Sequence, residues 1–300
     1  MTNVTCNLCG SDNYTVLFEK GVAQINQIVK CNNCGLMYAN PRIKDVDHVL
    51  IEDYDPDFVL SQIYNQDKDR LEKEALQVRD YETTKRFLSE HFPQKGKLVE
   101  VGSGLGYLLK FFKEDGWETV GLEPNAGMCK YAEVELGLTV ISKILEKAGF
   151  EDNSADTVLM MHVIEHVPEP ATTLKEIYRI LKPGGMLVLE TPRYDTLAFK
   201  LLGKRERSLS CDGHIYFFTS DTLAQIAKKV GFTIMRSDCV GRSLTLQRLF
   251  YNFGVISKNP FLQKLLRQIA TQFQLNKIWF NINARDMERI YLKKPEFLSE

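Results

Sequence analysis

The chain has 300 residues, of which 44% are hydrophobic and 26% charged, and its formal net charge is −1. This composition is that of an ordinary soluble globular protein, long enough to bury a large core. A net charge so close to zero gives no global sign of a nucleic-acid or anionic-membrane partner. The N-terminus has no basic start followed by an apolar run, and no stretch reaches the roughly 18 apolar residues of a membrane helix. We therefore expect a cytoplasmic protein with reduced cysteines.

The first 42 residues are predicted to form a small metal-binding module. Two C-x-x-C pairs, each followed by glycine, supply four thiolates at a spacing that suits one tetrahedral zinc ion: Cys6, Cys9, Cys31 and Cys34. Four cysteines leave no open position for water, so we expect the zinc to be structural and to supply folding energy. A redox pair or an iron–sulfur cluster is the alternative. The cysteines at 129, 211 and 239 are predicted to be buried apolar residues.

Strands and helices alternate in the rest of the chain. Residues 43–92 are predicted to form a helical connector, because apolar residues recur there with helical spacing. Beyond it, strands are expected at 97–101, 118–122, 138–141, 156–161 and 186–190, with helices at 107–115, 125–136 and 170–181 between them. This alternation predicts a parallel sheet with helices on both faces. The pattern then predicts a helix at 220–230, a strand at 232–240, a helical insertion at 244–284 and a last strand at 288–292.

A glycine-rich turn follows the first of these strands, at Gly102, Ser103, Gly104 and Gly106. Glycines at such a place let the backbone turn tightly and approach a ligand. The spacing G-x-G-x-G differs from the G-x-G-x-x-G of pyrophosphate-binding turns, which argues against an NAD-dependent oxidoreductase. Glu123 ends the next strand about 20 residues later, where a carboxylate can accept both hydroxyls of a ribose. A purely structural turn is the alternative.

Five segments, in this order, resemble the class I methyltransferases that use S-adenosylmethionine: VEVGSGLGYL, VGLEPN, ADTVLMMHVIEHVPEP, LKPGGMLVLETP and GHIYFFTSDTLAQIAKKVGF. They look most like the branch that includes ubiquinone-pathway O-methyltransferases and bacterial sugar and surface-polysaccharide methyltransferases. The segment CNNCGLMYANPR resembles the zinc-binding segment of such sugar methyltransferases. The resemblance implies an α/β, Rossmann-like, seven-stranded and mostly parallel sheet with a reversed last hairpin, in a methyltransferase domain spanning 93–300.

The same resemblance implies where the cofactor lies. The glycine turn would border its methionine and sugar parts, Glu123 would hold the ribose, and residues after the fourth strand would lie near the sulfonium. The implied contacts are Glu100, Gly102, Ser103, Gly104, Gly106, Glu123, Pro124, Leu145, Met161 and His162. Many relatives bind adenine with an acidic residue after the third strand, and here that position is left open between the backbone of Ile144 or Leu145 and the side chain of Glu146.

Methyl transfer to a hydroxyl needs an aligned acceptor and the removal of one proton, for which a histidine suits. We predict His214 as the general base, because it follows the long connection at 191–212 in the lid (191–219), which commonly covers the acceptor in this fold, and His166 is the second candidate. Basic side chains of this lid either bind a phosphorylated acceptor or form a solvated face: Arg193, Lys200, Lys204, Arg205 and Arg207.

The predicted activity is methyl transfer from S-adenosylmethionine to a hydroxyl of a sugar, as in nucleotide-linked or polysaccharide biosynthesis. Sugar C-methylation, RNA methylation and a catalytically silent binding protein are the alternatives. Nucleic acid is disfavoured, because we find no basic stripe paired with stacking aromatics in the zinc module. The apolar stripes in 244–284 are predicted to pack in a core, to cap the active site, to form a homodimer contact or to lie on a membrane surface.

Overall fold

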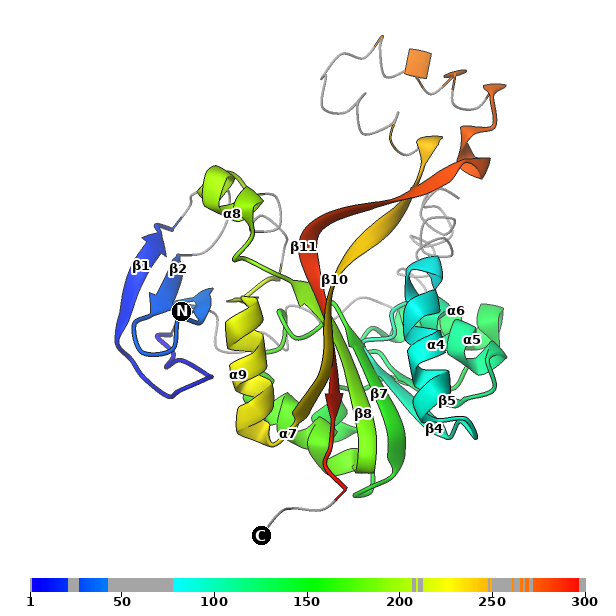
Figure 1. Ribbon diagram of the computed structural model, residues 1–300, viewed down its shortest axis with the longest axis horizontal. Coiled ribbons are helices and arrows are strands. Elements are labelled where there is room, and N and C mark those ends of the chain that lie inside the picture. The colour runs from blue at the N-terminus through cyan, green and yellow to red at the C-terminus, as the bar shows by residue number, and fades with distance from the viewer. Residues whose placement is uncertain are drawn as a thin grey trace.

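A computed structural model describes residues 2–20, 27–42, 78–206, 209, 213–247, 249, 261, 265–266, 268–269 and 272–296. Its larger sheet has seven strands (Figure 1), in the spatial order β10 (Thr233–Thr245), β11 (Trp279–Lys293), β8 (Leu181–Pro192), β7 (Ala155–Met161), β4 (Lys97–Val101), β5 (Glu118–Leu122) and β6 (Val140–Ile141). The strands from β8 to β6 run parallel, and β11 is antiparallel to both of its neighbours. The predicted Rossmann-like, seven-stranded sheet is confirmed.

Helices cover both faces of this sheet (Figure 1). One face carries α4 (Glu82–His91), α5 (Tyr107–Glu114) and α6 (Ala126–Leu136), and the other carries α7 (Pro170–Ile180) and α9 (Ser220–Val230). Local sequence sets the helix ends: Asn125 caps α6 by accepting a hydrogen bond from Met128 N, and Gly137 ends the helix with a positive φ of 62°.

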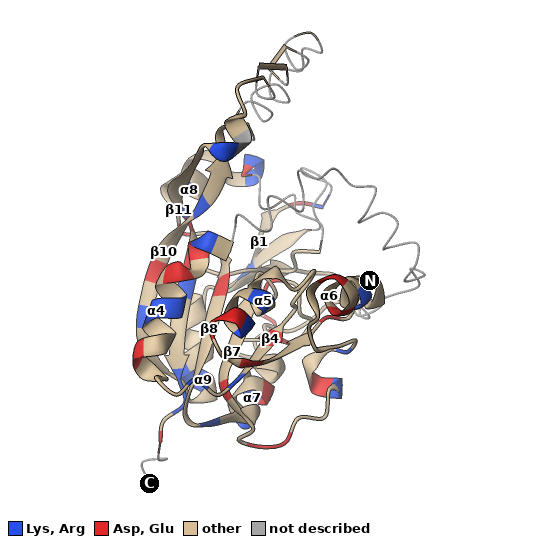
Figure 2. Ribbon diagram, turned by 90° about the vertical axis from the view of Figure 1, so that its right-hand side faces the viewer, with Lys and Arg blue, Asp and Glu red and all other residues tan. Residues whose placement is uncertain are grey.

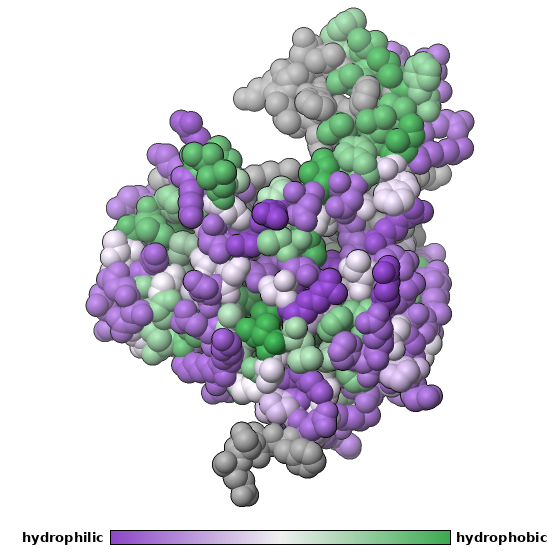
Figure 3. Space-filling view, in the orientation of Figure 1, coloured by the Kyte–Doolittle hydropathy of each residue, from purple (hydrophilic) through white to green (hydrophobic). Residues whose placement is uncertain are grey.

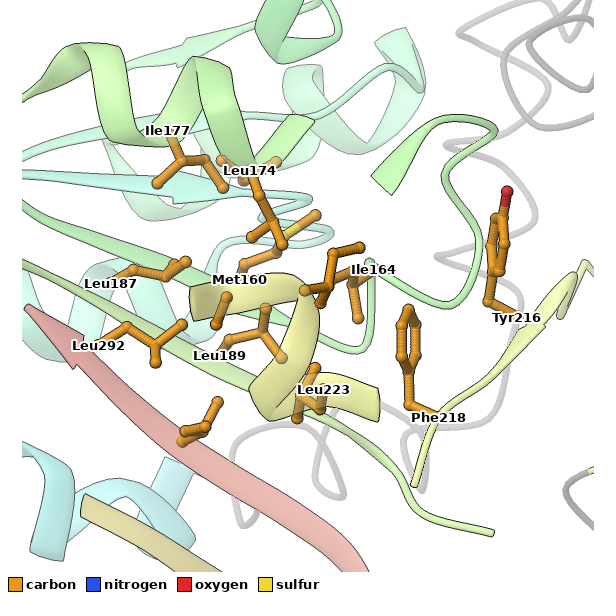
Figure 4. Packing of buried hydrophobic residues seen from close by; sticks show 14 of the residues in the cluster. Met160, Ile164, Leu174, Ile177, Leu187, Leu189, Tyr216, Phe218, Leu223 and Leu292 are labelled. Atoms are coloured by element: carbon orange, nitrogen blue, oxygen red, sulfur yellow. The ribbon is translucent and has the colours of Figure 1, made fainter. Parts of the chain in front are cut away.

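The core between the sheet and α7 and α9 is built from fully buried aliphatic side chains. Ile177 of α7 and Leu223 of α9 belong to one buried cluster with Met160 and Leu189 of the sheet, as Figure 4 shows. Burial of an aliphatic side chain of this size contributes about 1.5–3 kcal/mol. The short apolar strands therefore hold the carboxyl ends of β4, β5 and β7 rigidly at one edge.

A second, four-stranded sheet contains β1 (Tyr14–Phe18), β2 (Ile28–Cys31), β3 (Met37–Ala39) and β9 (Tyr216–Phe217). Its fourth strand, β9, comes from the end of the predicted lid and pairs with β3. The sequence placed only residues 1–42 in this unit, because a two-residue strand leaves no periodic signal. The small sheet also shares a hydrophobic cluster with the large domain, in which Tyr38 lies with Ile164 and Tyr216.

The predicted helical insertion at 244–284 is wrong at both ends. β10 continues to Thr245 and pairs there with Trp279 at the start of β11, so residues 279–284 are strand. Aromatic and β-branched residues favour a strand, and their pairing across the hairpin overrides the helical spacing of the apolar residues. Between these strands, described residues such as Leu265 and Ile269 are helical, as predicted.

Apolar side chains are exposed beyond the body of the sheet. They gather on the arm formed by β10 and β11 and on α8 (Leu197–Leu202), as Figure 3 shows. Phe261 is 75% exposed and Leu201 77%. The homodimer contact expected in this region stays a prediction. Among the described helices, none is long and apolar enough to cross a bilayer.

The predicted connector at 43–92 is described only from residue 78. There a short 3₁₀ helix, η2 (Val78–Tyr81), leads into α4. Asp80 of η2 accepts hydrogen bonds from the backbone and the hydroxyl of Ser243 on β10. This end of the connector therefore packs on the main domain, as predicted.

Candidate cofactor and acceptor site

The glycine turn joins β4 to α5 and faces open space at one residue. Gly102 N and Ser103 N donate to Leu122 O, at 2.8 and 2.9 Å. A Cβ at Gly102 would lie 2.4 Å from a methyl group of Val163, whereas a Cβ at Gly104 would meet no described atom within 4 Å. Gly104 also has a φ of 53°, which glycine adopts most readily. The turn is thus packed at Gly102 and accessible to a ligand at Gly104.

Glu123 lies against this turn, at the end of β5. Its Oε2 accepts a hydrogen bond from Gly104 N and its Oε1 from Asn125 N, both at 2.9 Å. Burial raises the pKa of this carboxyl and the two backbone donors lower it, with burial the larger effect. Each carboxylate oxygen keeps a lone pair. Glu123 is therefore placed at the turn with acceptor capacity for two further hydroxyls, the arrangement that a ribose needs.

Glu100 is a second acid in the same region, 3% exposed and inside β4. Its Oε2 has no hydrogen-bond partner among the described residues. Burial, followed by repulsion from Glu123, raises the pKa of Glu100 well above its ordinary value. Two neighbouring buried carboxyls are stabilised by a cationic ligand. S-adenosylmethionine carries an ammonium and a sulfonium, so the acids present fit this cofactor.

A cavity of about 320 Å³ lies at the carboxyl ends of β4, β5 and β7. Four of the predicted site residues line it: Gly102, Pro124, Leu145 and His166. Ligands of open parallel sheets bind at this edge. Other predicted cofactor residues lie beside it in the turn or in the strands: Glu100, Ser103, Gly104, Gly106, Glu123, Met161 and His162.

The sequence reasoning missed one wall of this cavity. Val163 and the first turn of α7, with Thr172 and Thr173, also line it. Thr173 Oγ1 donates to Glu146 Oε1 at 2.5 Å, so that Glu146 is already engaged. Of the three adenine contacts left open, the backbone at Ile144 and Leu145 fits this cavity best. Pro170, which begins α7, was the available signal that a helix starts at this edge.

A larger cavity of about 990 Å³ lies elsewhere, between η2 and the arm of β10 and β11. Most of its lining residues are polar or charged, among them Arg79 and Arg236, and Trp279 also lines it. It contains no residue of the glycine turn and none of the histidines. Size alone therefore does not identify the site, and the smaller cavity is the one that joins the predicted residues.

The two candidate bases come together although 48 positions separate them. The ring centroids of His166 and His214 are 4.6 Å apart, with an edge-on interplanar angle of 75°. Tyr194 OH lies 3.4 Å from His214 Nδ1. His166 belongs to the turn after β7, and His214 to the segment that enters β9. The fold thus assembles a pair of imidazoles at the edge of the cavity, which sequence spacing could not show.

Glu165 connects the chain segments that carry the two histidines. Its Oε2 accepts from Thr191 Oγ1 at 2.9 Å, and its backbone carbonyl accepts from Ile215 N and Tyr216 N at 2.9 and 3.1 Å. The side chain is 1% exposed. Glu165 therefore connects the turn after β7 to both β8 and the lid segment.

His162 has a different role from the other histidines of this edge. Its Nε2 lies 3.1 Å from Glu190 Oε1 and its Nδ1 lies 3.8 Å from Glu165 Oε1. Burial disfavours the charged ring, but the nearby carboxylates of Glu165 and Glu190 outweigh this and raise the pKa of His162 to about 9. His162 is therefore protonated at neutral pH and cannot accept the proton of an acceptor hydroxyl.

The lid arginine Arg193 is already paired, since its Nε and Nη2 donate to Asp195 at 2.7 and 2.9 Å. Lys200, Lys204 and Arg205 are exposed on α8 and the 3₁₀ turn η4 (Gly203–Arg205) that follows it. Arg207 and Cys211 lie outside the described residues. Among the described lid cations, Lys200, Lys204 and Arg205 are thus the ones exposed for a phosphate contact.

The four N-terminal cysteines converge as predicted. Cys6 Sγ lies 3.4 Å from Cys34 Sγ, and Cys9 Sγ lies 3.5 Å from Cys31 Sγ. All four sulfur atoms lie within 4.8 Å of one another. A tetrahedral zinc ion with bonds of about 2.3 Å needs sulfur atoms about 3.8 Å apart. The cluster therefore fits one zinc ion.

Each cysteine pair lies in the same kind of turn. Gly10 N donates to Cys6 O at 2.7 Å, and Gly35 N donates to Cys31 O at 3.0 Å. Burial opposes ionisation of Cys31, but the backbone donors of Cys34 and Asn33 lower the pKa of its thiol to about 7. A thiol that ionises near neutral pH is ready to bind a metal ion.

The N-terminal module contacts the loop after β7, which lines the cavity at Pro168, and the strand that follows His214. Arg42 Nη1 donates to Tyr216 OH at 3.0 Å and its Nη2 to Pro168 O at 2.8 Å. Asn7 Oδ1 accepts from Ala171 N at 2.8 Å. The module is thus fixed to the loop after β7 and to the strand that follows His214.

The chain was compared with known proteins. A tRNA U34 carboxymethyltransferase of Syntrophotalea carbinolica is 31% identical over 159 residues, which are 51% of this chain and 48% of that protein. A ubiquinone biosynthesis O-methyltransferase of Methylococcus capsulatus is 30% identical over 123 residues, 39% of this chain and 52% of that protein. The chain thus spans about half the length of these relatives.

A solved structure supports the fold. The crystal structure of a SAM-dependent methyltransferase from Archaeoglobus fulgidus superposes with a TM-score of 0.50 at 20% identity, covering 80% of this chain and 100% of the other. Residues 51–237, more than half of this chain, match a family described as a methyltransferase domain. That stretch includes the glycine turn, Glu123, His166 and His214. The chain belongs to the methyltransferase-domain family.

Proposed function

We propose that this protein transfers a methyl group from S-adenosylmethionine to a hydroxyl of a sugar, free, nucleotide-linked or in a polysaccharide. The contact between Glu123 and the backbone of Gly104 is the observation that carries the cofactor assignment, and the neighbouring residues Gly102 and Pro124 line a cavity of about 320 Å³. The Glu100 Oε2 atom, which has no hydrogen-bond partner among the described residues, supports it, since it would pair with a cationic part of the cofactor. In this proposal the cofactor supplies the methyl group and the protein supplies alignment.

The acceptor lies on the side of the histidine pair. His166 lines the cavity, and the ring of His214 packs against the ring of His166. Either imidazole can therefore reach a hydroxyl that approaches from the lid. His214 takes the proton as the hydroxyl oxygen attacks the methyl carbon, and His166 is the second candidate. His162 is excluded from this role because its pKa of about 9 keeps it protonated.

The test is a methyl-transfer assay with labelled S-adenosylmethionine and a panel of nucleotide-linked sugars and oligosaccharides. The proposal predicts label in a sugar, and nuclear magnetic resonance of the product would show the methyl on oxygen. A methyl on a sugar carbon would instead establish C-methylation, the alternative function. No label in any sugar, with S-adenosylmethionine bound, would overturn the sugar assignment.

RNA is the second acceptor class, because one relative acts on tRNA by its name. On the face that carries α4, α5 and α6, Figure 2 shows acidic and basic residues interspersed along the helices. We find no continuous basic stripe there among the described residues, as nucleic-acid binding would favour. The same assay with total tRNA separates the two classes, since label in tRNA alone would replace the sugar with RNA.

A further inference from the structure

The histidine pair and Glu165 form a cluster whose ligand set goes beyond what a general base requires. One ring nitrogen of His166, one of His214 and a carboxylate oxygen of Glu165 all lie within 4.8 Å of one another. Two imidazoles and one carboxylate are a recurring ligand set for divalent transition metals. Bonds of about 2.1 Å bring such ligand atoms to about 3.0–3.5 Å from one another. Small rotations of the two rings would therefore bring the three ligand atoms to bonding distance of one ion.

Two polar atoms of this cluster lack partners. Neither Glu165 Oε1 nor His166 Nδ1 has a hydrogen-bond partner among the described residues, and the Glu165 side chain is 1% exposed. A buried polar atom left unpaired costs about 1–3 kcal/mol. An ion bound to both atoms would remove this cost. His162 Nδ1 lies 3.8 Å from Glu165 Oε1, an ion-pair contact that a metal ion at Oε1 would replace.

The surrounding contacts fix the direction of the free oxygen. Glu165 Oε2 is held by Thr191 Oγ1 at 2.9 Å, so Oε1 is the atom left for an ion. On the other side, Tyr194 OH contacts His214 Nδ1 at 3.4 Å and orients that ring. Contacts of this kind, which orient a ligand without touching the ion, are the usual support of metal sites.

We propose that Glu165, His166 and His214 bind a divalent transition-metal ion, such as Mn²⁺, at the edge of the cavity. Three protein ligands leave at least one position for water or for a hydroxyl. This site has no thiolate, so it accepts Mn²⁺, whereas the four-cysteine cluster selects zinc. The two sites of the chain can therefore be distinguished by the choice of metal.

The catalytic consequence rests on the proposed function, whereas metal binding does not. A hydroxyl bound to the ion releases its proton to solvent water at a lower pH than a free hydroxyl does. Its oxygen then attacks the methyl carbon, the bond from that carbon to sulfur breaks, and the electron pair stays on sulfur. In the metal-loaded protein the two histidines would therefore be metal ligands. The ion, and not a histidine base, would then promote loss of the proton from the acceptor hydroxyl.

The test is a Mn²⁺ titration of the full, zinc-loaded chain, followed by electron paramagnetic resonance of the free ion. We expect one bound Mn²⁺ per chain, and affinities about 10-fold weaker or more in His166→Ala and His214→Ala, since losing even an outer contact costs that much. His91→Ala is the matched control, because that histidine lies on the exposed side of α4. Circular dichroism confirms that each variant is folded.

No bound Mn²⁺ in the native chain, or equal binding by His214→Ala, would overturn the inference. Calorimetry with S-adenosylmethionine on the same samples separates the two proposals. Cofactor binding without Mn²⁺ binding contradicts the metal site alone, and Mn²⁺ binding without cofactor binding contradicts the proposed function alone.

Discussion

The two sheets of this chain are stabilised by different means. In the large sheet, β7 and β8 contain almost only buried residues, such as Val158 and Leu187, both 0% exposed. In the small sheet, β1 has no fully buried residue, while β2, β3 and β9 pack in a hydrophobic cluster shared with the large domain, and the four-cysteine cluster includes Cys31 at the end of β2. The proposed cofactor residues Gly104 and Glu123 follow β4 and β5 of the large sheet, whereas β9, which follows His214, belongs to the small sheet. Unfolding of the small sheet should therefore lower the rate of methyl transfer before it weakens the binding of S-adenosylmethionine.

Removal of zinc should unfold the small sheet and leave the large sheet folded. Structural zinc contributes about 10–16 kcal/mol in isolated zinc-finger peptides, so this is the largest effect that we expect. We predict that Cys31→Ser loses one equivalent of zinc and that residues 1–42 become sensitive to protease, while S-adenosylmethionine still binds. Elemental analysis and limited proteolysis measure these changes. Cys239→Ser, on β10, is the control that should keep its zinc.

Two results would contradict this division between the sheets. One is purified native protein without zinc. The other is a Cys31→Ser variant in which the cofactor site unfolds together with the module.

The buried ion pair of the large sheet gives the second test. Arg289 Nε donates to Glu190 Oε2 at 2.6 Å, with the two side chains 1% and 5% exposed. Glu190→Gln leaves a buried guanidinium without its counter-ion, which should lower the free energy of unfolding by about 3–5 kcal/mol. The control is Glu176→Gln, whose partner Arg179 is 35% exposed, and there we expect about 0–1 kcal/mol. Urea unfolding measures both, and equal losses would refute the distinction.

The same pair predicts a dependence on pH. Burial opposes the charge of Glu190, but Arg289 and then His162 outweigh it and lower its pKa from 4.5 to about 2. The folded state thus holds this group ionised at a pH where the unfolded state protonates it. Its contribution to stability is complete above pH 4.5 and is lost as the pH falls towards 2. Glu190→Gln should show a flatter loss of stability across this range, and a slope equal to that of the native chain would exclude the assignment.

The acceptor side, where the two sheets meet, is tested by His214→Ala. Loss of a general base, or of a metal ligand in its place, should lower kcat about 100-fold or more. The dissociation constant of S-adenosylmethionine should stay the same, because His214 lies outside the glycine turn. His91→Ala is again the control. Unchanged turnover with the true acceptor would remove His214 from the mechanism.

The cofactor side could be predicted from the sequence because its signals are local. A strand, a glycine turn and Glu123 follow one another within some 25 residues, and the turn after β7 carries its own motif. The acceptor side depends on contacts between distant segments, such as that of His166 with His214 and that of Arg42 with Tyr216. The periodicity of hydrophobic residues in one sequence does not indicate such contacts.

In the arm formed by β10 and β11, the prediction from sequence is wrong for a different reason. The recurring apolar residues predict a helix over Trp279 to Ile282, but each of these residues pairs across the hairpin with β10. The pairing partner lies more than 30 positions away, so the helical interpretation was the only one that a local window could favour. The partner strand, and not the spacing, determines the structure there.

The central claim is that the glycine turn and Glu123 hold S-adenosylmethionine, and isothermal titration calorimetry tests it directly. We predict one saturable site for S-adenosylmethionine in the native chain and none for NAD. Glu123→Gln should weaken binding about 10- to 100-fold, since hydrogen bonds to a charged group contribute about 1.5–3 kcal/mol, whereas Glu118→Gln, at the exposed start of β5, should bind as the native chain does. A native chain that binds NAD instead, or a Glu123→Gln variant with undiminished affinity, would contradict this account.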